Sequence, residues 1–279
     1  MENSTPQVVT IAGSDSGGGA GIQADLKTFQ ARQVFGMSIV IALTAQNTLG
    51  VQESYPIPCE FIDAQFASLA ADFAIKASKT GMLADSEHVA AVIKNLKTYD
   101  FGPLVVDPVM IAKGGHPLLT EDAIQLIKEE LLPLATIVTP NLPEAEVLVG
   151  YTIETEADMQ RAARDLQQLG VQHVVMKGGH KEGVESADYV LLADQISFWL
   201  RTPRIATKNT HGTGDTFSSC IVAELAKGAT VKEAIITAKK FIQGAIQEGI
   251  FVGHGHGPTN HWAQLSKDVR VEKNANETY

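Results

Sequence analysis

The stretch Asn-Thr-His-Gly-Thr-Gly-Asp-Thr-Phe at 209–217 decides the fold and the chemistry of this chain. Two glycines free the backbone at Gly212 and Gly214, and an apolar pattern of helical spacing follows from Phe217. A glycine-rich turn that opens a helix presents unpaired N–H groups, and the helix dipole adds partial positive charge. The stretch therefore predicts an anion site, and the acid Asp215 beside it requires a chemical reason.

Length and charge exclude several classes of protein. The 279 residues are enough for one α/β domain with a large core. The chain has 32 acidic and 22 basic residues, a net charge of −10, and no cluster of Lys and Arg, so we expect no nucleic-acid partner. The polar N-terminus lacks the pattern of a secretory leader, and no apolar run approaches the length of a membrane span. We expect a cytoplasmic protein without a membrane partner.

Apolar runs alternate with stretches of helical spacing along most of the chain. Strands are predicted at 8–12, 38–45, 51–57, 75–79, 104–106, 135–138 and 173–176, followed by an antiparallel pair at 189–192 and 196–200. Helices are predicted at 22–32, 61–73, 86–96, 156–169, 214–226 and 231–247. This order is typical of a mostly parallel sheet with helices on both faces. We predict one domain over 1–265 and a polar, disordered tail over 266–279.

Polar signatures recur where the predicted parallel strands end. They lie at 46–48, 80–82, 107–109, 139–144 and 177–180. Ligands of open α/β sheets bind at this edge, so the recurrence predicts a site there. The glycine-rich loop 13–21 follows the first strand, but Ile22 occupies the last glycine position of the dinucleotide fingerprint G-x-G-x-x-G, and the chain has no P-loop motif.

Seven motifs in order resemble one family, the hydroxymethylpyrimidine/phosphomethylpyrimidine kinases of thiamine synthesis, within the ribokinase-like superfamily. They are A-G-S-D-S-G-G-G-A-G-I-Q-A-D-L-K-T-F at 12–29, A-Q-N-T-L-G-V-Q at 45–52, K-T-G-M-L at 79–83, V-D-P-V-M at 106–110, T-P-N-L-P-E-A at 139–145, K-G-G-H at 177–180 and K-N-T-H-G-T-G at 208–214. The resemblance runs from about Val8 to His261. It implies a three-layer α/β/α fold, ATP and Mg²⁺ as cofactors, a small-molecule acceptor and a homodimer.

The resemblance gives the acid of the opening stretch a role. Phosphoryl transfer needs charge compensation, in-line positioning and a group that accepts the hydroxyl proton. Asp215 is the proposed base, and Gly212, Thr213 and Gly214 supply the amides of an anion hole. The pyrimidine kinases usually have Cys at the position of Asp215, whereas ribokinase-like sugar kinases and the larger pyridoxal kinases have Asp.

The donor side is assigned by the same resemblance. Glu144 follows Asn141 in an N-x-x-E pattern that helps to place Mg²⁺, and Asp107 is a second candidate near the metal and the phosphates. Taken alone, Glu144 is equally well read as a first-turn helix acid. Lys177 resembles the family lysine that contacts nucleotide phosphates, although a lysine before two glycines also fits a solvent-facing edge. The remaining nucleotide candidates are Lys208 and Thr210.

The acceptor side is expected at Gly13, Asp25, Gln46, Met82 and Val109, of which Asp25, Gln46 and Met82 match pocket positions of the family that the chain resembles. A glutamine amide can pair at once with the ring nitrogen and the amino group of an aminopyrimidine, which favours Gln46 as the main substrate contact. Met82 and Val109 would supply apolar contact to the flat ring.

Other interpretations remain open. A pyridoxal or pyridoxine kinase is the nearest alternative, and a non-catalytic binding protein on the same fold is another. A NAD-dependent dehydrogenase is disfavoured by the missing fingerprint. The histidines at 254, 256 and 261 lie among glycines without a nearby carboxylate or cysteine, which argues against a metal site. The loop 111–119 is a candidate flap over the donor phosphate.

Overall fold

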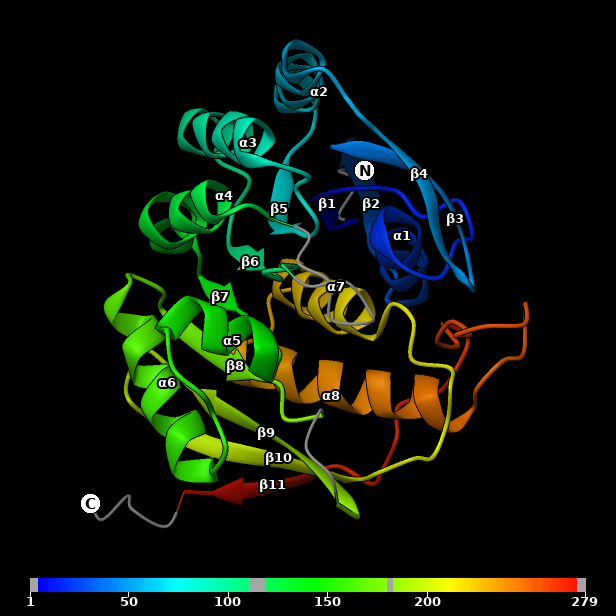
Figure 1. Ribbon diagram of the computed structural model, residues 1–279, viewed down its shortest axis with the longest axis vertical. Helices are drawn as coiled ribbons and strands as arrows, with labels where there is room; N and C mark the ends of the chain where they lie inside the picture. Colours follow the sequence, from blue (N-terminus) through cyan, green and yellow to red (C-terminus); the bar gives the residue numbers. More distant parts are fainter. Residues whose placement is uncertain (1–4, 111–118, 180–182, 275–279) are drawn as a thin grey trace.

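Nine of the strands form one sheet, which lies between two layers of helices (Figure 1). The computed structural model describes residues 5–110, 119–179 and 183–274, so the candidate flap at 111–118 lies outside the described residues. The strand order is β11-β10-β9-β8-β7-β6-β5-β1-β2. The parallel part consists of β1 (Gln7–Ala12), β2 (Phe35–Val40), β5 (Ile75–Thr80), β6 (Leu104–Val106), β7 (Ile137–Val138) and β8 (His173–Met176). The antiparallel part consists of β9 (Glu185–Leu191), β10 (Ser197–Pro203) and β11 (Arg270–Lys273).

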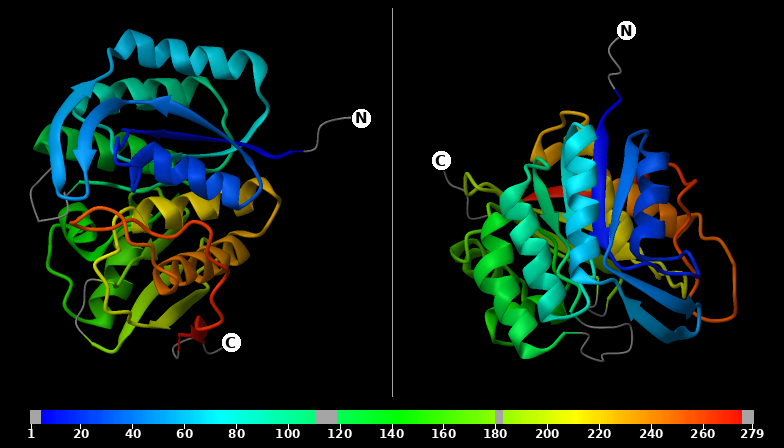
Figure 2. Two further views of the ribbon diagram at one scale, coloured as in Figure 1. Left: turned by 90° about the vertical axis from the view of Figure 1, so that its right-hand side faces the viewer. Right: turned by 90° about the horizontal axis from the view of Figure 1, so that it is seen from above.

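Helices cover both faces of this sheet, as Figure 2 shows from two further directions. One layer contains α2 (Cys59–Asp72), α3 (Ser86–Thr98), α4 (Glu121–Leu126) with the turns that continue it to Leu134, α5 (Leu142–Val149) and α6 (Glu156–Gln168). The other layer contains α1 (Gly21–Ala31), α7 (Thr213–Ala226) and α8 (Val231–Gln247). The predicted α/β class with a mostly parallel sheet is confirmed.

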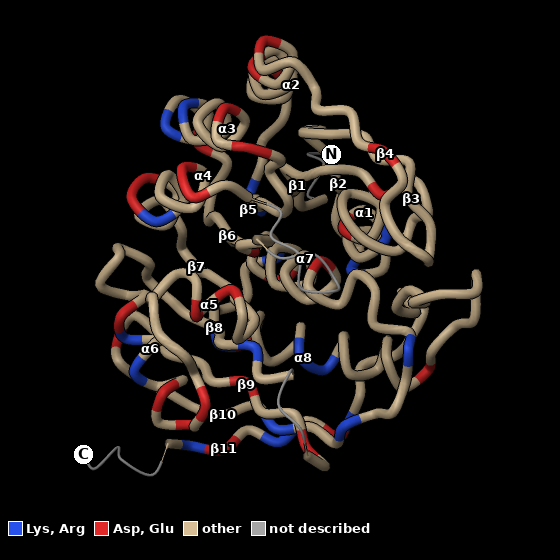
Figure 3. The backbone as a smooth tube through the Cα atoms, viewed as in Figure 1, with Lys and Arg blue, Asp and Glu red and all other residues tan. Residues whose placement is uncertain are grey.

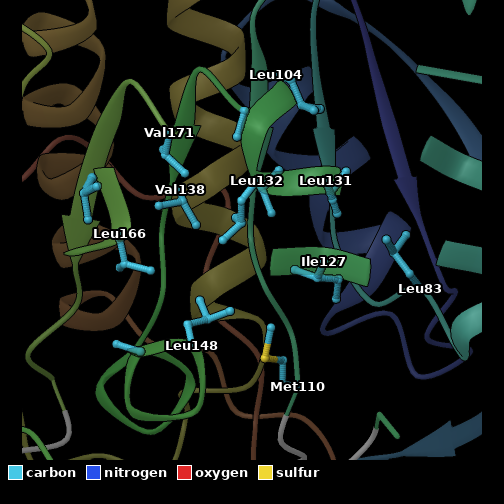
Figure 4. Packing of buried hydrophobic residues seen from close by; sticks show 14 of the residues in the cluster. Leu83, Leu104, Met110, Ile127, Leu131, Leu132, Val138, Leu148, Leu166 and Val171 are labelled. Atoms are coloured by element: carbon cyan, nitrogen blue, oxygen red, sulfur yellow. The ribbon is translucent and has the colours of Figure 1, made fainter. Parts of the chain in front are cut away.

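Two hydrophobic cores enclose the central strands of the sheet, one on each face. Successive side chains of a strand point to opposite faces. Val105 accordingly packs in the core under α7 and α8, and its neighbour Val106 packs in the core under α2 to α6. Figure 4 shows part of the second core, where Leu131, Val138 and Leu148 meet from three different elements. Because both faces are covered, central strands such as β6 and β7 are continuous apolar runs rather than alternating ones.

A separate two-stranded sheet corrects one strand prediction. The apolar run 38–45 is not one strand, because β2 ends at Val40 and β3 (Ala42–Asn47) leaves the main sheet to pair with β4 (Gly50–Pro56). Ile39 and Ile41 are fully buried, whereas Leu43 is 47% exposed. The run of apolar letters crosses the point at which the chain leaves the core, so periodicity alone could not locate it.

One strand lies within the predicted C-terminal tail. The sequence predicts a disordered tail from residue 266, but β11 pairs antiparallel with β10 and extends the sheet by one edge strand.

Lysines and arginines are scattered over many elements among acidic residues (Figure 3). Within the described residues, no helix combines the length and the apolarity that crossing a membrane requires.

Candidate active site

The predicted site residues lie at the edge of the sheet where the parallel strands end. Gly13 follows β1, Gly81 follows β5, Asp107 follows β6, Asn141 lies beyond β7 and Lys177 follows β8. The chain continues from β1 to β2 on one side, while β5 pairs with the other side of β1. The strand order thus reverses at β1, and a ligand crevice of an open α/β sheet lies at such a point.

The N-terminus of α7 faces this edge. Gly212 caps the helix with a φ of 76°, a conformation that glycine adopts without strain. The first-turn amides of a helix have no partner within the helix, and they carry the positive end of its dipole. A Cβ built on Gly214 would lie 3.0 Å from Asp107 Oδ2 and 3.3 Å from Lys177 Nζ. The structure therefore brings the predicted anion hole against two of the predicted donor residues.

Asp107, Glu144 and Lys177 form a charged cluster beside the anion hole. Lys177 Nζ lies 3.0 Å from Asp107 Oδ1, and both carboxylates are almost completely buried, with 2% exposure for Asp107 and 3% for Glu144. Burial would lower the pKa of Lys177, but the carboxylates of Asp107 and Glu144 outweigh it and raise that pKa. Burial raises the pKa of Glu144 to about 7; Lys177 opposes this rise, and the negative charge of Asp107 adds to it. An approaching cation would relieve this excess of negative charge.

Asn141 and Glu144 show why the N-x-x-E pattern has two meanings. Glu144 N–H donates to Asn141 Oδ1 at 2.9 Å, and Asn141 N–H donates to Glu144 Oε2 at 2.8 Å. This reciprocal pair is a capping box that begins α5. Because the box holds Glu144 in the buried cluster, the same residue starts the helix and points a carboxylate at the site.

Asp215 lies in the first turn of α7 and is connected to two residues behind it. Lys79 Nζ is 3.8 Å from Asp215 Oδ1 and 2.7 Å from Asp25 Oδ1. Asp25, predicted to contact the acceptor, is 0% exposed and also accepts from Thr10 Oγ1 at 2.6 Å and from Ser219 Oγ at 2.5 Å. The structure places Asp25 beneath the site instead of in its wall, because its oxygens are occupied by these donors.

Lys79 is one of the site residues that the sequence analysis does not single out, although it belongs to the motif at 79–83. The available signal was a lysine inside an apolar strand that ends at the ligand edge, where a buried charge needs a partner.

On the acceptor side, Gly13 and Met82 are in contact. Gly13 N–H donates to the Met82 carbonyl at 3.1 Å, and a Cβ on Gly13 would lie 2.4 Å from Met82 Cε. The end of the Met82 side chain therefore packs directly on Gly13 where β1 ends. Val109 is half-buried and lines a small cavity with Thr80 and Gly81.

Gln46 lies on β3, outside the main sheet, and reaches the loop before α7. Its Oε1 accepts from Thr44 Oγ1 at 3.2 Å, and its Nε2 lies 3.3 Å from His211 Nε2. Gln46, which is predicted to bind the acceptor substrate, is thus adjacent to the stretch 209–217.

Asp15 organises the glycine-rich loop before α1. Gly17 N–H donates to Oδ1 at 2.8 Å, and Gly19 and Ala20 N–H donate to Oδ2 at 3.0 and 2.9 Å. His211 Nε2 lies 2.8 Å from the same Oδ2. Burial would raise the pKa of Asp15, but the hydrogen bond from His211 and those from the backbone outweigh it and lower that pKa.

Three further candidates are placed as follows. Lys208 is exposed, and the Thr210 carbonyl accepts from Thr213 Oγ1 at 3.2 Å at the start of α7. Their contact with a nucleotide stays a prediction. His261 is almost buried, and its Nε2 lies 3.1 Å from Thr216 Oγ1. Among the described residues, no group of three or more His, Cys, Asp or Glu side chains could by itself hold a metal ion.

Comparison with known proteins agrees with this geometry. A model of the family described as phosphomethylpyrimidine kinase matches residues 15–260. A hydroxymethylpyrimidine/phosphomethylpyrimidine kinase of Haemophilus influenzae is 54% identical over 260 residues, which are 92% of this chain and 97% of the relative. The pyridoxal kinase of Staphylococcus aureus in complex with AMP-PCP has a TM-score of 0.89 at 34% identity, covering 97% of this chain and 99% of that one. The ADP complex of the Bacillus subtilis pyridoxal kinase has a TM-score of 0.87 at 41% identity, covering 93% and 98%. The fold is thus the ribokinase-like fold predicted from the sequence. The chain belongs to the phosphomethylpyrimidine kinase family.

Proposed function

We infer that this chain is an ATP-dependent hydroxymethylpyrimidine/phosphomethylpyrimidine kinase of thiamine biosynthesis. It phosphorylates 4-amino-5-hydroxymethyl-2-methylpyrimidine and then the monophosphate that results. The observation that carries the inference is the meeting of Asp215, Asp107, Glu144 and Lys177 at the N-terminus of α7, in a chain 54% identical to a kinase of this name. Relatives of the same fold bind AMP-PCP and ADP, which supports ATP as the donor.

The proposed roles follow from the geometry of the anion hole. The amides of Gly212, Thr213 and Gly214 stabilise the charge on the phosphoryl group while it is transferred. Lys177 neutralises a donor phosphate from the opposite side, since its Nζ lies 3.3 Å from the Cβ position of Gly214. The acceptor hydroxyl oxygen forms a bond to the γ-phosphorus, the bond between that phosphorus and the β,γ-bridging oxygen breaks, and Asp215 takes the hydroxyl proton.

The acids of the site fit a magnesium ion. Among the described residues, one cluster beside the anion hole joins four carboxylates and two ammonium groups, a formal excess of two negative charges: Asp25, Asp107, Glu144 and Asp215 against Lys79 and Lys177. We propose that Asp107 and Glu144 hold Mg²⁺ together with water and nucleotide phosphates, the ligand set that this ion prefers. The ion supplies compensation for phosphate charge when it is bound.

The acceptor pocket is proposed at Gly13, Gln46, Met82 and Val109. The Gln46 amide would pair with the ring nitrogen and amino group of the pyrimidine, and the Met82 side chain would contact the ring face. We place Asp25 behind this pocket, because its carboxylate is fully buried. Lys208 and Thr210 are proposed to border the nucleotide.

The chain is further proposed to be a homodimer built from one kinase domain over 1–265. The family match over 15–260 supports the domain bounds. The arm formed by β3 and β4 carries exposed apolar side chains, among them Leu49 at 73% and Tyr55 at 62%, which support self-association.

The function is tested by following ADP release with four acceptors: hydroxymethylpyrimidine, its monophosphate, pyridoxine and pyridoxal. We expect the two pyrimidines to be the better acceptors. Pyridoxal kinases share the fold at TM-scores up to 0.89, so pyridoxine and pyridoxal are the acceptors against which the pyrimidines must be compared. Better turnover of pyridoxine and pyridoxal would assign the chain to the phosphorylation of vitamin B6, and no turnover with any acceptor would support a binding protein.

A further inference from the structure

Lys79 is a fully buried cation directly behind the proposed base. It lies near the end of β5 with 0% exposure and is among the largest completely buried side chains. Its Nζ bridges Asp25 Oδ1 at 2.7 Å and Asp215 Oδ1 at 3.8 Å. Packing alone does not account for a lysine here, because an aliphatic side chain fills such a position without the cost of burying a charge.

Asp25 holds this lysine in its charged form. Thr10 and Ser219 donate to the two oxygens of Asp25, from β1 and α7. Burial raises the pKa of Asp25 to about 6 against the opposing effect of Lys79, and Asp215 adds to the rise. Burial would lower the pKa of Lys79, but the carboxylates of Asp25 and Asp215 outweigh it and raise that pKa.

Two further carboxylates lie near the base. Asp107 approaches from β6 and Glu144 from α5, and a bound nucleotide adds its phosphates. The other cation of the cluster, Lys177, is bound to Asp107 at 3.0 Å and faces the donor side. Lys79 is therefore the cation on the base side of the described site.

We propose that Lys79 is a positioning residue for the phosphoryl transfer. It fixes the Asp215 carboxylate toward the acceptor hydroxyl and offsets the repulsion between that carboxylate and the phosphates. Asp25 acts through Lys79 as its buried counter-ion. This role rests on the proposed kinase function.

The first experiment compares kcat and KM of Lys79→Met with those of the wild-type enzyme. We expect kcat to fall by about a hundredfold, the size of a general-base contribution, while KM for ATP stays near the wild-type value.

A double variant separates this role from plain structural support. Lys79→Met leaves Asp25 buried without its counter-ion, which alone could disturb the fold. Asp25→Asn combined with Lys79→Met removes both charges of the pair and keeps a polar partner for Thr10 and Ser219. We expect the double variant to unfold at a higher denaturant concentration than Lys79→Met but to keep the low kcat. Recovery of kcat together with stability would overturn the proposal, because Lys79 would then serve only to neutralise Asp25.

Ser78→Ala is the matched control, since Ser78 is the preceding residue of β5 and its buried hydroxyl has no hydrogen-bond partner among the residues that the structure describes. This variant should keep the kcat and the KM for ATP of the wild-type enzyme. Failure of the kinase function would appear as an inactive wild-type protein with every acceptor. Failure of the Lys79 proposal would appear as an active wild-type enzyme whose Lys79→Met variant keeps the wild-type kcat.

Discussion

His211 Nε2 lies 2.8 Å from Asp15 Oδ2, and this pair joins the two glycine-rich loops of the site. Asp15 gathers the amides of the loop before α1, and His211 belongs to the loop before α7. The two loops touch again where a Cβ on Gly212 would lie 1.9 Å from the Gly19 carbonyl oxygen. The anion hole is therefore held against the first loop by a charged hydrogen bond and by backbone contact.

Replacing Asp15 with Asn should loosen both loops. A carboxylate accepts on both oxygens, whereas an amide offers one acceptor and a donor that would face N–H groups. We expect the free energy of unfolding to fall by about 2 kcal/mol and phosphorylation to slow. The lowered pKa of Asp15 means that its contribution is present above its unfolded value of 3.8 and is lost as the pH falls through the lower folded value. Urea unfolding at neutral pH measures the change, with Asp194→Asn in an exposed turn as the control. Equal stability of the two variants would contradict the role given to Asp15.

Asp215→Asn tests the base directly. The amide keeps the shape of the side chain but cannot take the hydroxyl proton, so kcat should fall by about a hundredfold or more. Nucleotide affinity should change little, because the amides of α7 and Lys177 remain. Single-turnover rates and ADP binding by calorimetry give the two quantities separately. An asparagine variant with nearly full kcat would remove Asp215 from the mechanism.

Gly212→Ala should damage the site more than its backbone strain alone explains. Gly212 has a φ of 76° and Gly228 a φ of 89°, so alanine is strained at both by about 1 kcal/mol. Only at Gly212 would the new Cβ meet backbone, whereas nothing lies within 4 Å of the Cβ position at Gly228. We expect Gly228→Ala to lose some stability and retain activity, and Gly212→Ala to lose stability and most of its kcat. Thermal unfolding and the ADP-release assay compare the pair, and similar activity of both variants would contradict the contact with the first loop.

Much of the fold could be predicted because local patterns and global packing agree. The predicted helix at 231–247 coincides with α8, and the predicted strand at 173–176 coincides with β8. The division of 38–45 between two sheets was not predictable, because the apolar letters continue past the point where the core ends. The polarity of residues 270–273 predicts disorder, yet these residues form a strand. The side chains of an edge strand can be polar and exposed while its backbone still pairs with the neighbouring strand.

The site was predictable where motifs mark strand ends and unpredictable where its residues act through others. Asp107 and Lys177 were named from the sequence and lie together in the structure. Lys79 and Asp15 were missed, since their importance comes from partners that are distant in sequence. The motif predicts that Asp25 contacts the acceptor substrate, because the sequence of a motif does not reveal whether a side chain faces the ligand or the core.

His261 gives a pH dependence of stability that can be measured without substrate. Burial, helped by the positive charge of Lys27, lowers the pKa of His261 to about 4 from an ordinary 6.5. Above pH 6.5 the imidazole is neutral in both the folded and the unfolded protein, so it does not change how the free energy of unfolding depends on pH. Between pH 6.5 and 4 the unfolded chain takes up a proton that the folded chain refuses, so the free energy of unfolding falls by about 3 kcal/mol in this window.

His261→Gln should remove this part of the acid sensitivity, since a glutamine does not titrate and can still hydrogen-bond to Thr216. The measurement is the free energy of unfolding of both proteins at a series of pH values between 4 and 7. His256→Gln is the control, because His256 is exposed and should leave the slope of the wild-type protein unchanged. If wild-type and His261→Gln proteins lose stability in parallel over this range, the buried imidazole does not titrate as its surroundings require.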